Sequence, residues 1–485
     1  MSLIGIDLGT SAIKVAAYAV DGTLLAEARQ AVPAHRPQPG YWEVDVGESL
    51  TAFREALTTV ANHPRVRADP PRAISFSSSG REIFPAADDG APLGPCLMTA
   101  DVRGDDVAAR TAARRSTEEW FRLAGHVPGR MDPVNRILWW QETNREAAAS
   151  ARWFMNWHDY YALLLSGVPV ADASGAGAWA VYDLSSKTWS ADLVAEVGLD
   201  PQWLPVIQPS ASPIAPVTPA AAREFGLPED TLIVTGAWDF CAAALGTGAV
   251  DARTLALASG SWHSFLLPVP SGWKEDLVDE GIAAIPHPGP LGFALASFDP
   301  NGMSVIDWAR DLLGLSHREL EEGLRGCGPG PGPIFAEPTF TPLPHVPATG
   351  RGGLLSGLCL SSSKVDVVRA LLEGIACDFS LALDRLHRHG CSPQVIRASG
   401  GGAGSAWFMQ LHADLTGLPV EVVSQGEPGA FGAALMAGVG CGAYSDLTTA
   451  IDRLVVVSRR FEPDPERGRR FDPIRTRLVT AGMGG

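Results

Sequence analysis

The segment Leu3-Ile4-Gly5-Ile6-Asp7-Leu8-Gly9-Thr10-Ser11 decides the fold of this chain. An apolar run ends at a carboxylate, a turn that contains glycine follows, and a second apolar run, Ile13–Val20, comes directly after it. Asp21-Gly22 then leads into a third run, Thr23–Val32. Apolar runs separated by such turns predict a meander of three strands, the last two joined by a tight hairpin.

The first turn is also suited to binding phosphate. A glycine lets backbone N–H groups approach an anion. The hydroxyls of Thr10 and Ser11 and the cation of Lys14 could then help to hold phosphate oxygens and the Mg²⁺ bound to them. On these residues alone, an ordinary hairpin turn with a surface Asp is an equally good interpretation, because short glycine motifs are common.

A second unit of the same kind follows residue 245. Thr254–Ala258, the turn Gly260-Ser261 and Ser264–Val269 repeat the order of strand, turn and strand. The length of 485 residues exceeds what one core usually supports. We therefore expect an α/β protein of two like domains, residues 1–246 and 247–485.

The remaining chain adds helices and one long loop. Apolar spacings of three and four predict amphipathic helices over 47–62 and 365–387, and small residues mark a third helix over 427–438. The Pro/Gly-rich residues 327–353 are expected to form a surface loop, because proline fixes an extended path.

Composition and charge exclude several classes of protein. The formal net charge is −16, whereas nucleic-acid binding needs a basic face. No stretch approaches the ~18 consecutive apolar residues of a membrane helix, and the first residues lack the pattern of a signal peptide. The seven cysteines are scattered without a CxxC pair, as is typical of buried thiols in a reducing compartment. We expect a cytoplasmic protein that binds neither nucleic acid nor membrane.

A series of short motifs, each weak alone, occurs in order along nearly the whole chain. They are Asp7-Leu8-Gly9-Thr10, Glu43-Val44-Asp45, Asp101-Val102-Arg103, Asp159-Tyr160, Gly236-Ala237-Trp238-Asp239, Gly260-Ser261, Gly353-Leu354-Leu355-Ser356-Gly357-Leu358 and Gly400-Gly401-Gly402-Ala403-Gly404-Ser405. In this order they resemble the FGGY carbohydrate kinases, relatives of glycerol kinase and xylulokinase in the actin/Hsp70/sugar-kinase superfamily. The resemblance implies two ribonuclease-H-like (actin-like ATPase) domains that flank a deep cleft, with ATP and Mg²⁺ bound there.

The resemblance also implies roles for individual residues. Asp7 would orient Mg²⁺ through water. The nucleotide would be bound by Asp7, Gly9, Thr10, Ser11, Lys14, Gly260, Ser261, Gly401, Gly402 and Ser405. Glu43 and Asp45 match a family motif as well, but we expect them to serve as caps or turn residues. His158 and His412 have no partner at metal-ligand spacing, so no metal beyond the nucleotide's Mg²⁺ is expected.

Asp239 matches the catalytic base of the family. A neutral hydroxyl is a poor nucleophile, and a carboxylate within hydrogen-bond reach can take its proton as the bond to phosphorus forms. The alternative is an N-cap on a helix over Phe240–Gly246, and the two roles do not exclude each other.

The acceptor site is expected at Arg81 and Glu82, with Asp101 and Asp239. Glycerol kinases carry an Arg-Glu pair there that grips polyol hydroxyls, xylulokinases have Met-His, and autoinducer-2 kinase has Arg-Glu. The two aromatic walls of glycerol kinase would fall at Thr99 and near Met131, so a wider pocket is expected. A surface ion pair is the alternative for Arg81 and Glu82.

The sequence thus predicts an ATP-dependent kinase of an open-chain sugar or polyol, such as a ketose like xylulose or a C4–C6 polyol. An autoinducer-2-type or glycerol-type kinase, a non-kinase ATPase of the same superfamily, and a catalytically idle sugar sensor are the alternatives. The oligomeric state stays open between a monomer and a homodimer.

Overall fold

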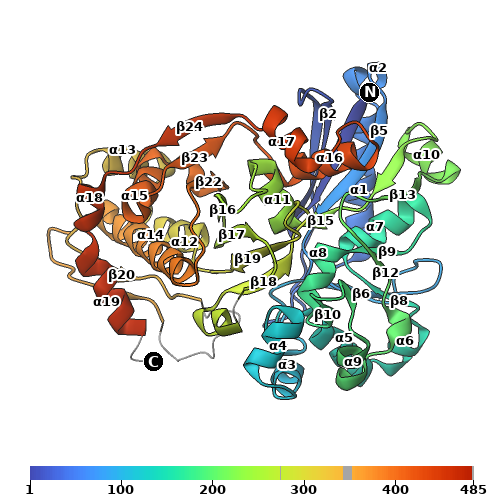
Figure 1. Cartoon of the computed structure of the whole chain (residues 1–485), viewed down its shortest axis with the longest axis horizontal. Coiled ribbons are helices and arrows are strands. Elements are labelled where there is room, and N and C mark those ends of the chain that lie inside the picture. The colour runs from blue at the N-terminus through green and yellow to red at the C-terminus, as the bar shows by residue number, and fades with distance from the viewer. Residues whose placement is uncertain (274, 342–351, 483–485) are drawn as a thin grey trace.

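The computed structural model describes residues 1–485 except 274, 342–351 and 483–485. Two seven-stranded sheets lie beside each other, one built from the first half of the chain and one from the second (Figure 1). This is the α/β architecture with two sheet-containing domains that the sequence predicts.

The first sheet has the order β13-β14-β5-β1-β2-β3, and β15 also pairs with β5. Its strands are β1 Ser2–Leu8, β2 Ala12–Ala19, β3 Leu24–Ala31, β5 Pro71–Ser78, β13 Pro213–Pro216, β14 Leu232–Val234 and β15 Ala237–Trp238. The first three strands are antiparallel and β5 is parallel to β1, as the predicted meander requires.

The second sheet has the order β18-β19-β17-β16-β22-β23-β24. Its strands are β16 Thr254–Ser259, β17 His263–Val269, β18 Ala283–Pro286, β19 Phe293–Ser297, β22 Val395–Ser399, β23 Val420–Val423 and β24 Val457–Phe461. An antiparallel meander with β22 parallel to β16 repeats the plan of the first sheet.

Helices cover both sheets. In the first half they are α1 Val46–Ala61, α2 Pro64–Ala68, α3 Asp105–Ala112, α4 Thr117–Ala124, α5 Pro133–Thr143, α6 Arg145–Ser150, α7 Trp157–Ser166, α8 Ala173–Ala176, α9 Ala191–Val197, α10 Pro219–Phe225 and α11 Asp239–Thr247. In the second half they are α12 Met303–Leu313, α13 His317–Arg325, α14 Lys364–Arg388, α15 Ala406–Thr416, α16 Pro428–Gly440, α17 Leu447–Leu454, α18 Pro465–Arg469 and α19 Asp472–Gly482. Within the described ranges, none of these helices is long and apolar enough to cross a membrane.

Short elements complete the chain. The remaining strands are β4 Glu43–Val44, β6 Phe84–Ala86, β7 Cys96–Leu97, β8 Trp153–Met155, β9 Val170–Asp172, β10 Tyr182–Asp183, β11 Thr188–Trp189, β12 Val206–Gln208, β20 Phe335–Glu337 and β21 Leu354–Ser356. Short 3₁₀ turns lie at Gly177–Trp179, Pro201–Trp203, Glu275–Glu280 and Gly401–Gly404.

Local chemistry explains the predicted elements. The Asp21 carboxylate accepts a hydrogen bond from the Thr23 N–H at 3.0 Å and closes the β2–β3 hairpin. Asp45 caps α1 by accepting from the Glu48 N–H at 3.0 Å, which is the structural role expected for it.

Two expectations need correction. Residues 327–353 are not loop throughout, because β20 pairs there with β21, and 342–351 lie outside the described residues. The cysteines are not uniformly buried, since Cys359 is exposed and Cys327, Cys391 and Cys441 are half-buried.

The two halves interlock through α11 and α16. Although α16 belongs to the second half, it lies against β1, where a Cβ on Gly5 would come within 1.8 Å of the Ala430 carbonyl oxygen. A Cβ on Gly432 would come within 1.9 Å of the Ala242 carbonyl, so only glycine permits these backbones to approach so closely. The domain boundary near residue 246, at the end of α11, stays a prediction.

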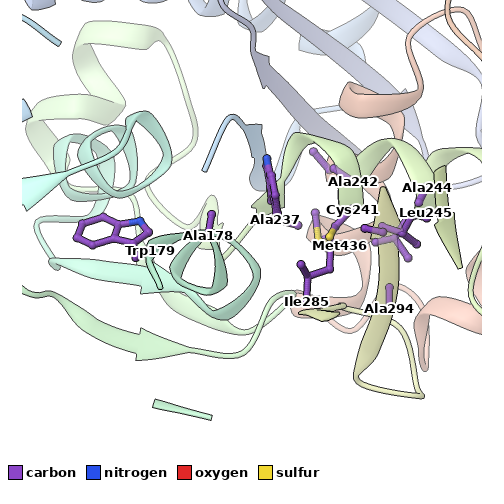
Figure 2. Packing of buried hydrophobic residues seen from close by; sticks show 14 of the residues in the cluster. Ala178, Trp179, Ala237, Cys241, Ala242, Ala244, Leu245, Ile285, Ala294 and Met436 are labelled. Atoms are coloured by element: carbon purple, nitrogen blue, oxygen red, sulfur yellow. The ribbon is translucent and has the colours of Figure 1, made fainter. Parts of the chain in front are cut away.

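The core continues through this junction (Figure 2). Cys241 and Leu245 of α11 belong to one buried cluster with Ile285 of β18, Ala294 of β19 and Met436 of α16. One apolar cluster therefore joins residues of both sheets.

Candidate active site

The first phosphate-binding turn lies where β1 turns into β2. Asp7 and Lys14 are cross-strand partners in the antiparallel register, and Ser77 of β5 is the partner of Asp7 on its other side. The Lys14 Nζ lies 3.6 Å from the Asp7 carboxylate, and the Ser77 hydroxyl donates to it at 2.7 Å. Burial raises the pKa of Asp7, while Ser77 and Lys14 oppose that rise.

The start of α16 closes this corner from the other half. The Lys14 ammonium donates to the Glu427 carboxylate at 2.6 Å. A Cβ on Gly429 would lie 2.8 Å from the Asp7 carboxylate, so the helix start fits tightly over Asp7. Sequence reasoning expected a helix at 427–438 but missed this contact. Pro428 at the first helical position marks the helix start, yet nothing local shows that it faces Lys14.

The second turn and the glycine-rich segment lie next to each other. β16 pairs in parallel with β22, so Gly260-Ser261 and Ser399–Gly401 follow neighbouring strand ends. Arg459 of β24 donates to the Ala403 carbonyl at 2.6 Å and so holds the 3₁₀ turn, a contact not anticipated from the sequence.

Asp239 lies just after β15, at the first residue of α11. Its carboxylate accepts from the Phe240 N–H at 2.7 Å. Burial, and then the charge of Asp7, raises the pKa of Asp239 to about 6, although Phe240 and Arg81 lower it. The N-cap of α11 is Trp238, so the alternative interpretation of Asp239 as the N-cap is wrong.

Arg81 and Glu82 follow β5 and are 7% and 0% exposed, so the surface ion pair considered for them is also wrong. Arg81 Nη1 pairs with Asp132 at 3.0 Å instead of with Glu82. Glu82 accepts from the Thr99 hydroxyl at 3.5 Å, and burial with the charge of Asp239 raises its pKa to about 8. Glu82 is therefore mostly a neutral acid near pH 7.

Asp101 is fully engaged in a structural pair. Its carboxylate binds Arg103 at 2.6 Å and accepts from the Trp42 N–H at 2.6 Å. Arg103 also pairs with Glu43 at 2.6 Å, so Glu43 has a structural contact, but as an ion-pair partner in β4 and not as the cap or turn residue expected.

Sequence reasoning missed the residues that hold Arg81 in place. Asp132 also contacts His126 Nε2 at 3.1 Å. Arg136, which is completely buried, donates to the Arg81 carbonyl at 2.5 Å and to the Thr99 carbonyl at 2.6 Å. The sequence signal that could have identified Arg136 is an arginine among the apolar residues of a helical segment, because such a charge is rarely buried without partners.

An aromatic wall faces Arg81. Trp238 and Phe298 stack with ring centroids 5.2 Å apart, and Phe240 lies 5.2 Å from Phe298. The Arg81 guanidinium lies 5.4 Å from the Trp238 ring and 5.7 Å from the Phe298 ring. Phe298 follows β19, so the second half of the chain supplies part of this wall.

The phosphate-binding turns, Asp239, Arg81 and the aromatic residues Trp238 and Phe298 all contribute to the lining of one cavity of about 990 Å³. Of the predicted residues, Asp7, Thr10, Lys14, Arg81, Asp239, Gly260, Ser261 and Gly401 line it. Gly9, Ser11, Glu82, Asp101, Gly402 and Ser405 do not belong to that lining, and Ser405 instead caps α15. Thr99 and Met131 line the cavity as well, and the wider pocket expected from them stays a prediction.

The donor set fits a hydrated divalent cation beside a phosphate chain. Asp7 and Glu427 both line the cavity, with carboxylates 3.6 Å and 2.6 Å from the Lys14 ammonium. In the part of the chain that the structure describes, no group of three or more His, Cys, Asp or Glu residues is placed to hold a metal directly. Two carboxylates suit a cation that keeps most of its water, as Mg²⁺ does.

Comparisons with known proteins agree with this geometry. The family model described as the N-terminal domain of the FGGY family of carbohydrate kinases matches residues 2–246, and the C-terminal domain model matches residues 304–441. The chain is 26% identical to the L-xylulose/3-keto-L-gulonate kinase of Escherichia coli (strain K12), over 95% of this chain and 92% of that protein.

A second relative and a solved structure extend the likeness. Identity to the autoinducer-2 kinase of Enterobacter sp. (strain 638) is 26%, over 97% of this chain and 92% of that protein. The crystal structure of xylulose kinase from Rhodospirillum rubrum superposes with a TM-score of 0.89 at 25% identity, covering 99% of this chain and 98% of that one.

Proposed function

Because the chain belongs to the FGGY family of carbohydrate kinases, and so transfers phosphate from ATP to a sugar hydroxyl, we propose that its acceptor is an open-chain ketose or C4–C6 polyol and that Asp239 is the general base. The observation that carries the proposal is the position of Asp239. It lines the same cavity as Asp7, Lys14 and Arg81, and its carboxylate feels the charges of both Asp7 and Arg81.

The side chains divide the reaction between them. Asp239 accepts the proton of the attacking hydroxyl, and its pKa of about 6 leaves it mostly ionised at pH 7 yet more basic than an ordinary Asp. Lys14 and the backbone N–H groups of Thr10 and Ser261, which line the cavity, bind the phosphates, whereas the Gly9 and Gly260 N–H groups donate to the Ala12 and Trp262 carbonyls. Asp7 would hold Mg²⁺ through water, and the ion when bound neutralises charge on the transferred phosphoryl group.

The acceptor corner favours a neutral substrate. The charge of Arg81 is already balanced by Asp132, and Glu82 is mostly protonated, so a carboxylate on the acceptor would find little unbalanced positive charge. Ser79, Thr99 and Arg81 offer hydrogen bonds to the cavity, and the Trp238 and Phe298 rings, against which the Arg81 guanidinium packs, add apolar surface to it. An acceptor that carries both hydroxyls and an apolar group fits this lining, which keeps the autoinducer-2-type kinase as the second candidate.

Release of ADP from Mg·ATP across a panel of acceptors tests the proposal. The panel contains xylulose, C4–C6 polyols, glycerol, a sugar acid and a methyl-bearing dihydroxy-dione. Strong stimulation by a ketose or polyol is the expected result. Stimulation by the sugar acid alone would contradict the proposal, and stimulation by the dione alone would select the second candidate.

A further inference from the structure

An ion pair inside the cavity joins residues from the two halves of the chain. Lys14 belongs to β2 of the first sheet, and Glu427 lies immediately before α16 of the second half. Their atoms are 2.6 Å apart, and the side chains are 26% and 38% exposed. Glu427 sits at the N-cap position of α16, but its side chain makes no capping hydrogen bond and contacts Lys14 instead.

Lys14 is therefore shared between two carboxylates. Asp7 lies 3.6 Å from its ammonium, and Glu427 lies 2.6 Å from it. The tight fit of Gly429 over Asp7 fixes the start of α16 and, with it, the position of Glu427. A phosphate chain that binds Lys14 competes with Glu427 for the ammonium.

We propose that Glu427 makes the enzyme selective for magnesium-loaded nucleotide over free nucleotide. When Lys14 leaves Glu427, the carboxylates of Glu427, Asp7 and Asp239 all face the same cavity. A free nucleotide brings further negative charge and meets this repulsion, whereas a divalent cation carried with the nucleotide balances it. Glu427 is a positioning residue that acts through Lys14 and the metal.

The inference rests on the proposed function only in assuming that this cavity binds an adenine nucleotide. Its test is calorimetric titration of the full-length protein with ADP, once with Mg²⁺ and once with EDTA. ADP is used without an acceptor, so no turnover occurs and binding alone is measured.

In the variant Glu427→Gln, metal-free ADP should bind about three- to tenfold more tightly, because Lys14 is released, while Mg·ADP binds more weakly by a similar factor. In the background Lys14→Met, adding Glu427→Gln should tighten metal-free binding by a smaller factor, because only the repulsion by the Glu427 charge is then removed. Glu427→Asp keeps the charge and should keep most of the selectivity. Glu462→Gln is the matched control, because it removes an exposed carboxylate that pairs with Arg460 outside the cavity, and it should change neither affinity.

If Glu427→Gln weakened the binding of metal-free ADP and of Mg·ADP by the same factor, the inference would be overturned, because that result is expected when Glu427 only supports the start of α16. Unchanged affinities for metal-free ADP and Mg·ADP, or an equal increase in both, would overturn it as well. If the wild-type protein bound no ADP in either buffer, the proposed function itself would fail, and the inference with it.

Discussion

Replacing Asp239 by Asn tests the assignment of the general base. The change keeps the shape of the side chain and removes the charge, and it leaves an amide oxygen to accept from the Phe240 N–H as the carboxylate does at 2.7 Å. We expect turnover to fall at least about 100-fold, the usual scale of general-base catalysis. Binding of ADP and acceptor should change much less, because Asp239 would act mainly in the transition state.

The pH dependence provides a second measure of the same group. A base with a pKa of about 6 is ionised to about nine tenths at pH 7 and to about one tenth at pH 5, so activity should fall roughly tenfold between them. Neutralisation of Asp7 by Mg²⁺ would remove one cause of the raised pKa, but burial, the larger cause, remains. The pKa that describes the loss of activity at acid pH should therefore stay well above 3.8, the ordinary value for Asp.

Steady-state kinetics from pH 5 to 8, with acceptor and Mg·ATP varied in turn, measures both effects. The control is Asp88→Asn, because the Asp88 side chain is 91% exposed. An Asp239→Asn enzyme that turns over at the wild-type rate, or that retains the acid limb near pH 6, would refute the assignment.

Three further predictions concern the two corners of the cavity. Asp7→Ala should lower turnover alike with every acceptor, and an effect confined to one acceptor would place Asp7 in the acceptor site. Arg81→Ala should lower kcat/KM for the acceptor at least about tenfold with little change in KM for ATP. Glu82→Gln should lower that kcat/KM much less than Glu82→Ala, because a residue with a pKa of about 8 is already mostly neutral at pH 7. Phe298→Ala should raise the acceptor KM about three- to tenfold, the scale of one aromatic contact, and an unchanged KM measured by the ADP-release assay would exclude Phe298 from the acceptor wall.

The sequence alone predicted much of the fold because the signals are local. The alternation of apolar runs with the turns at Gly9–Ser11 and Asp21-Gly22 specifies β1 to β3, and the 3.6-residue periodicity specifies α1 and α14. The ordered motifs identified the family, since a phosphate-binding turn needs glycine and hydroxyl residues at fixed positions.

What the sequence could not show is which side chains meet across the cleft. Lys14 and Glu427 are 413 positions apart, and Phe298 reaches Trp238 and Arg81 from the other half of the chain. Such contacts depend on how α16 packs on β1 and α11, which no local pattern encodes.

Burial was likewise decided by the tertiary structure. Arg81 and Glu82 are adjacent in sequence and suggested an ion pair, yet packing directs Arg81 to Asp132 and buries Glu82 beside Thr99, where loss of solvent and the charge of Asp239 raise its pKa to about 8. Asp239 could be named from its motif, but its pKa of about 6 arises from burial and from Asp7, two strands away in the sheet. The sequence thus determined which chemical groups the cavity could contain, and the folded structure determined their charge and their partners, because both depend on solvent exclusion and on neighbours distant in sequence.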